Sequence, residues 1–206
     1  IEAFKEKYNI ILFTCDTYRK LAMLNGFCGT HILPEDITII NPPFSFLLRK
    51  IPGLGLLKYH LLVSYFKSLN NDFDILFGMY KEIDFGRVAI QYIHVPELNK
   101  NDERVSQSSV KYYQNSFMGS VYKKTCYLIS GFQSQRMKKN VTIVDSGWAK
   151  NMVEKTLGIK SWVIYPPVTA VTRLIPFDKK ENGFVYLGRI TPPKEIEKII
   201  NIVSEV

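Results

Sequence analysis

Residues 141–159 read VTIVDSGWAKNMVEKTLGI and combine a strand, a turn and a helix. The first four residues are apolar or β-branched, which is typical of a short buried strand. A helix is expected over residues 149–157, because Asp145, Ser146 and Gly147 can supply an N-cap before it and Gly158 favours a cap at its end. A strand followed directly by a helix is the repeating unit of a parallel sheet covered by helices.

The same alternation continues through the rest of the chain. Short apolar runs that end at turn-forming or proline residues predict strands, and longer runs between them predict helices. The further expected strands are 8–14, 37–40, 74–78, 88–95 and 162–165, and the further expected helices are 56–69 and one or two within 105–130. We therefore predict an α/β fold with a Rossmann-like parallel sheet flanked by helices.

The composition is that of a globular protein with a core, since 46% of the residues are hydrophobic and 22% are charged. A net charge of +8 leaves two interpretations open, an anionic partner or a lysine-rich surface that is simply solvated. The chain contains neither G-x-G-x-x-G nor G-x-x-x-x-G-K-[ST], which argues against dinucleotide oxidoreductases and P-loop enzymes. Three scattered cysteines and three scattered histidines predict neither a disulfide framework nor a zinc site, and they favour a reducing compartment.

Ligands of parallel sheets bind at the carboxyl ends of the strands. This rule selects residues 14–16, 78–80, 94–96 and 145–147. His94 is the residue of most chemical interest among them, and Pro96 directs the chain out of the sheet just after it. A lone histidine at a strand end is more often structural than catalytic, so both interpretations remain open at this point.

Residues 183–200 read GFVYLGRITPPKEIEKII, which predicts a short strand, a turn and a second helix. Arg189 and Lys194 lie five positions apart where that helix begins. Two cations beside a helix N-terminus suit a phosphate or diphosphate group. The alternative is an exposed arginine and lysine without a ligand.

Four segments in this order resemble the retaining glycosyltransferases of the GT-B fold, family 4. They are QYIHVPE (91–97), VTIVDSGWAKNMVEKTLGI (141–159), VIYPPV (163–168) and FVYLGRITPPKEIEKII (184–200), whereas residues 1–90 match only in general architecture. The resemblance implies an acceptor-side Rossmann-like domain over 1–171, a linker over 172–182 and the first strand and helix of a donor-binding domain over 183–206. It also implies that both domains are truncated and that these residues alone are inactive.

The resemblance implies roles for individual residues as well. His94 would be the catalytic residue of the cleft, and Gly188, Arg189 and Lys194 would bind the diphosphate of the donor. Members of the family usually carry glycine directly after this lysine, where this chain has Glu195.

Contacts with the acceptor are expected at Tyr92, Glu97 and Ser146. Tyr92 and Glu97 are candidates because they flank His94. For Ser146, capping of the following helix is a sufficient explanation by itself.

The implied reaction transfers a sugar from a nucleoside-diphosphate sugar to a glycolipid or polysaccharide acceptor with retention of configuration. Neither a metal ion nor another cofactor is expected, and no nucleic acid partner. The alternative function is a non-catalytic GT-B-like module for binding or scaffolding.

The expected location is the cytoplasm, with peripheral contact at the inner face of an anionic membrane. Residues 44–66 combine apolar residues with Arg49, Lys50 and Lys58, and Pro52 and Gly53 interrupt them. This pattern fits either a loop plus a core helix or a basic, apolar surface that contacts lipid, and it argues against a membrane-spanning helix. The cluster Arg136, Lys138 and Lys139 either extends such a surface or is a solvated helix end.

Overall fold

The computed structural model describes residues 1–15, 19–50, 54–96, 117–167, 175–188, 190 and 194–205. Two residues with predicted roles, Glu97 and Arg189, lie outside these ranges, as does Asp16 at the end of the first strand.

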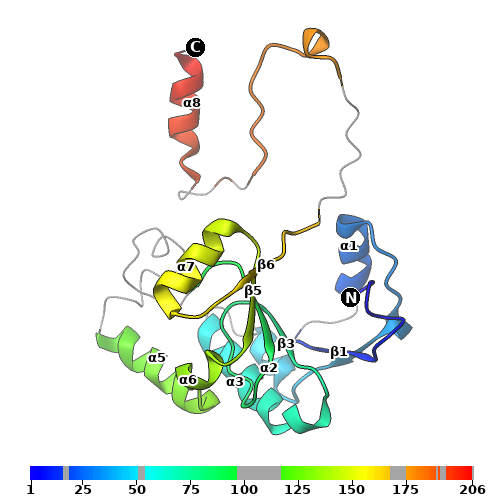
Figure 1. Ribbon diagram of the computed structural model, residues 1–206, viewed down its shortest axis with the longest axis vertical. Helices are drawn as coiled ribbons and strands as arrows, with labels where there is room; N and C mark the ends of the chain where they lie inside the picture. Colours follow the sequence, from blue (N-terminus) through cyan, green and yellow to red (C-terminus); the bar gives the residue numbers. More distant parts are fainter. Residues whose placement is uncertain are drawn as a thin grey trace.

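The strands form two parallel sheets, which confirms the α/β class (Figure 1). The smaller sheet pairs β1 (Ile10–Phe13) with β2 (Ile37–Ile40). The larger sheet has the order β3 (Phe77–Tyr80), β4 (Ile90–Ile93), β5 (Val141–Val144) and β6 (Trp162–Val163). All four described pairings are parallel. The connections from β1 to β2 and from β5 to β6 run through helices, as is usual for parallel strands, whereas residues 81–89 join β3 to β4 without a helix.

Seven α-helices are described along the chain. They are α1 (Arg19–Cys28), α2 (Ser45–Lys50), α3 (Gly55–Ser68), α5 (Phe117–Ser130), α6 (Ser134–Met137), α7 (Gly147–Leu157) and α8 (Ile196–Ser204). Short 3-10 helices lie at Pro34–Asp36, Asn70–Asp72 and Phe177–Lys179. Helices α3 and α5 pack against each other, whereas α7 contacts β5 and β6 (Figure 1). Helices α1, α2 and α6 have no counterpart among the expected elements.

The best-packed unit of the sheet consists of β4, β5 and α7. Ile93, Val144, Ala149 and Val153 are fully buried there. Side chains of β4 alternate between buried and half-buried, which is the two-residue period of a strand. This unit holds the ends of β4 and β5 in place, and those ends carry the candidate site.

The expected strand at 74–78 is wrong in its bounds, because β3 begins at Phe77 and ends at Tyr80. Gly78 therefore lies inside the strand and not at its end. The side chains of Ile83 and Phe85 pack onto it so closely that a Cβ atom would lie 2.5 Å from Ile83 Cγ2. Of the predicted edge residues 78–80, only Tyr80 stands at the carboxyl end.

A buried carboxylate joins the loop after β3 to two helices. Asp84 is 1% exposed and binds Lys67 of α3 at 2.9 Å and Arg136 of α6 at 2.8 Å. Burial by itself raises the pKa of Asp84, but hydrogen bonds from Arg136, the Gly86 N–H and Lys67 outweigh it and lower the pKa to about 2. The cluster therefore satisfies the charges of two half-buried cations inside the fold.

Residues after the sheet follow a different pattern. The expected strand near residues 184–187 is not formed, because no neighbouring strand pairs with it among the described residues, and residues 183–188 are all exposed. The expected helix is confirmed as α8, and none of its described residues is buried. No helix among the described residues has both the length and the apolar character that crossing a bilayer requires.

Candidate functional site

The register of the sheet brings His94 and Asp145 together. Ile93, the last residue of β4, pairs with Val144, the last residue of β5. The residues that follow, His94 and Asp145, therefore leave adjacent strands at the same level. His94 Nδ1 lies 2.7 Å from Asp145 Oδ2, at the edge where parallel sheets bind ligands.

Asp145 fixes both the orientation and the tautomer of the imidazole ring. A carboxylate oxygen accepts a hydrogen bond, so the His94 Nδ1 carries the proton and donates the hydrogen bond to Asp145 Oδ2. The side chains of His94 and Asp145 remain 39% and 23% exposed. The pair is thus held firmly and still reachable from solvent, which suits a group that contacts a substrate.

Ser146 supports this pair from the start of α7. Its hydroxyl donates to Asp145 Oδ1 at 2.9 Å and accepts from the Ala149 N–H at 3.2 Å. The predicted N-cap is therefore confirmed. The same hydroxyl also holds the second carboxylate oxygen of Asp145, so the helix start and the strand end form one hydrogen-bonded unit.

Tyr92 forms one wall of the site. Its hydroxyl donates to the Ile164 carbonyl at 3.0 Å, and its ring meets the His94 ring edge to face at 5.2 Å between centroids. Burial and, next, the negative charge of Asp145 raise the pKa of the Tyr92 phenol. Tyr92 thus connects His94 to the segment that leaves β6.

Of the predicted diphosphate residues, Gly188 and Lys194 lie within the described ranges, and neither is brought to this site. Gly188 and Lys194 are exposed, and no hydrogen bond or ion pair within the described part of the chain links either residue to His94. Figure 1 shows α8 away from the larger sheet. A phosphate clamp at Gly188, Arg189 and Lys194 therefore stays a prediction.

Asp145 is the site residue that the sequence analysis did not identify as functional. Residues 145–147 were selected as part of the sheet edge, with a helix cap and an acceptor contact at Ser146 assigned there, but no contact with His94 was expected for Asp145. The pairing with His94 depends on the adjacency of β4 and β5, which are separated along the chain by residues 94–140. The available signal was that both residues directly follow an apolar strand.

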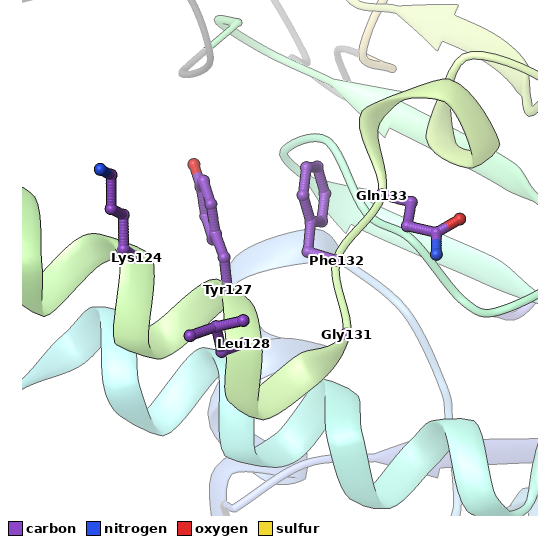
Figure 2. A pocket seen from close by; sticks show the side chains of 6 residues that line it. All are labelled: Lys124, Tyr127, Leu128, Gly131, Phe132 and Gln133. Atoms are coloured by element: carbon purple, nitrogen blue, oxygen red, sulfur yellow. The ribbon is translucent and has the colours of Figure 1, made fainter.

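The described residues hold no group of three or more side chains of the metal-binding types. A hollow of about 460 Å³ lies at the C-terminal end of α5, not at the strand ends (Figure 2). It is lined by Lys124, Tyr127, Leu128, Gly131, Phe132 and Gln133.

Comparison with known proteins gives no match to the chain from a family model, a curated protein or a solved structure.

Proposed function

We propose that the protein is a glycosyltransferase that moves a sugar from a nucleoside-diphosphate sugar to a hydroxyl group of a glycolipid or polysaccharide, with retention. The observation that carries the proposal is the His94–Asp145 pair at the carboxyl edge of a parallel sheet. A ligand-binding edge with an oriented imidazole suits recognition of a polar, hydroxyl-rich substrate. The reaction class is inferred from the resemblance of residues 91–97, 141–159, 163–168 and 184–200 to segments that follow in the same order in the family-4 glycosyltransferases.

In this proposal His94 contacts the sugar at the reacting centre, and Asp145 keeps its ring in one orientation. The bond from the sugar C1 to the diphosphate oxygen breaks, and the acceptor oxygen bonds to C1 on the same face. The acceptor proton passes to the departing phosphate. Arg189 and Lys194 neutralise the charge that develops on this leaving group, as pre-arranged cations do in phosphate chemistry.

The test measures release of nucleoside diphosphate by the complete gene product, with a panel of nucleoside-diphosphate hexoses and alkyl glycoside acceptors. His94→Ala is expected to lower kcat by about 100-fold, the usual loss when one oriented polar group is removed from a reacting centre. His31→Ala is the matched control, because His31 is exposed outside the site. Unchanged turnover in His94→Ala, or no donor consumed by the native protein, would refute the proposal. An inverted anomer in the product would refute retention alone.

Asp145→Ala tests whether the pair acts as a unit. We expect kcat to fall by about tenfold, as for other residues that orient a functional histidine. Nitrogen-15 NMR of His94 gives a second measurement, because the proton should leave Nδ1 for part of the population once its acceptor is removed. An unchanged tautomer together with unchanged kcat would show that the contact has no role in the reaction.

The competing function is a non-catalytic binding or scaffolding module. Arg189→Ala distinguishes the two, because a transferase should lose most of its turnover with the diphosphate contact, while a scaffold has no turnover to lose. Lys180→Ala serves as the control cation, since Lys180 is exposed outside the proposed diphosphate site.

A further inference from the structure

Helix α5 directs its large apolar side chains toward solvent. Phe117, Val121, Lys124 and Leu128 are spaced by four, three and four residues, which places them along one face of a helix. Phe117 and Leu128 are 82% and 80% exposed, and Val121 is 44% exposed. These four residues are called the outer face of α5 below.

The opposite side of α5 faces the protein with small residues. Gly119, Cys126 and Ser130 are its buried residues. Two hydrogen bonds join this side to α3, since the His60 ring nitrogen Nδ1 lies 2.7 Å from Ser130 Oγ and the Tyr122 hydroxyl accepts from the Leu57 N–H at 3.1 Å. A surface helix normally places its apolar residues inward. The exposed phenylalanine and leucine on one line therefore indicate a surface that something else covers.

The charge of this region has a single sign. Residues 117–144 contain no aspartate or glutamate. Lys124 lies in the middle of the outer face and is exposed, and Lys123 lies beside it on the helix. Lys138 and Lys139 add two further lysines to this stretch, whereas the charge of Arg136 is satisfied by Asp84. The partner of the outer face must therefore tolerate apolar side chains and attract cations at the same time.

Figure 2 shows the hollow at the C-terminal end of the outer face, with Lys124, Tyr127 and Phe132 extending to the same side. The rings of Tyr127 and Phe132 stack at 5.0 Å between centroids. An aromatic body with a polar tip is favoured where an apolar phase meets water. The surroundings of the outer face thus have the composition of an interfacial surface.

Two other partners fit this surface less well. A second copy docked through the same face would bring the lysines of both copies into one interface without an acidic residue between them, because a two-fold contact uses the same patch on both copies. A nucleic acid would contact the lysines through its phosphates but would leave Phe117 and Leu128 without an apolar environment.

We propose that the outer face of α5 docks on an anionic lipid bilayer. The helix lies in the plane of the interface, its apolar side chains enter the boundary of the acyl chains, and its lysines reach the headgroup phosphates. The proposal is independent of the proposed function, and its surface is distinct from residues 44–66.

The test is flotation of the 206-residue chain with vesicles of phosphatidylcholine alone or mixed with phosphatidylglycerol. We expect at least about tenfold stronger binding to the anionic vesicles, as for a surface with several lysines. Leu128→Asp should weaken that binding by about tenfold or more, because it removes buried apolar area and adds a repelled charge. Phe177→Asp is the matched control, since Phe177 is 87% exposed outside α5. Lys124→Gln should weaken binding by about fivefold, the effect of one basic residue near such a surface.

Circular dichroism of each variant shows whether the fold is retained. Three results would each overturn the proposal: no binding to anionic vesicles, equal binding by Leu128→Asp and the native chain, or a dimer that Leu128→Asp dissociates without vesicle binding. Vesicle binding that Lys124→Gln weakens and Leu128→Asp leaves unchanged would show attraction by charge alone, which also contradicts docking through the apolar residues.

Discussion

Two parts of the chain follow the same strand-and-helix pattern but differ in what covers their apolar residues. In the unit of β4, β5 and α7, Ile93 and Val153 are fully buried. In the segment that leads to α8, Val185 and Leu187 are 95% and 98% exposed. The first unit gains its stability from packing between elements, whereas α8 is supported by local interactions along its own backbone. An apolar pattern therefore specifies the type of element, and burial depends on the neighbours that pair with it.

Removal of the buried carboxylate gives the largest expected effect on the packed part. Asp84→Ala leaves Lys67 and Arg136 without their buried partner and should lower the free energy of unfolding by about 3–5 kcal/mol. Urea denaturation measures the change. Asp178→Ala, in the exposed segment, is the control and should change the stability by less than about 0.5 kcal/mol. A loss below about 1 kcal/mol for Asp84→Ala would show that the cluster does not stabilise the fold.

The same carboxylate predicts the direction of a pH effect. Its pKa is lowered from 3.8 to about 2, so the unfolded chain binds the proton more tightly. The contribution of Asp84 is complete above the unfolded pKa and is lost as the pH falls through the folded pKa. Between about pH 4 and pH 2 the free energy of unfolding, measured by urea denaturation at each pH, should therefore change less for Asp84→Ala than for the native chain. An equal dependence of the free energy of unfolding on pH in both proteins would contradict the lowered pKa of Asp84.

An isoleucine pair compares the two parts directly. Ile93→Ala removes a fully buried side chain of β4 and should cost about 3 kcal/mol through lost burial and the cavity left behind. Ile190→Ala makes the same change at a residue that is 87% exposed, so it should cost less than about 0.5 kcal/mol. Similar losses for both variants would show that residue 190 is covered in solution, and the contrast between the two parts would fail.

The sequence predicts the packed unit well where the signals are local. Strands β2 and β5 have the bounds expected from the apolar runs. Helix α7 ends at Gly158, which adopts the left-handed conformation with φ 66° that favours glycine. Its start, expected at residue 149, lies at Gly147 because Ser146 itself is the N-cap. Each of these features depends on residues that are close in the chain.

Features that depend on distant partners were not predictable in this way. His60 and Lys67 lie on the expected helix 56–69, and their partners Ser130 and Asp84 lie 70 and 17 residues away. His60 faces the protein interior, where burial and then the charges of nearby lysines lower its pKa to about 4. The His94–Asp145 pair shows the same limit, since Asp145 lies 51 residues from His94. Sequence order selected both strand ends but did not establish that they touch.

The smallest expected effect concerns Glu195, at a position where the glycosyltransferases that the sequence resembles usually carry glycine. Its φ of 47° lies in the left-handed region, which costs a non-glycine residue about 1 kcal/mol. Its exposed ion pair with Lys198, 2.8 Å long, offsets only about 0.3–0.5 kcal/mol of that cost. Glu195→Gly should therefore stabilise α8 slightly, by less than about 1 kcal/mol.

Hydrogen exchange of the α8 amides measures this change. Local interactions stabilise α8, so global unfolding does not report on the opening of this helix. Protection is expected to rise by less than about fivefold in Glu195→Gly. Glu197→Gly is the matched control, and it should lower protection, because Glu197 lies in the first turn of the helix where glycine only adds backbone freedom. Equal losses in the two variants would mean that the conformation of Glu195 is not strained. A rise confined to Glu195→Gly would show that the segment carries a backbone position suited to glycine.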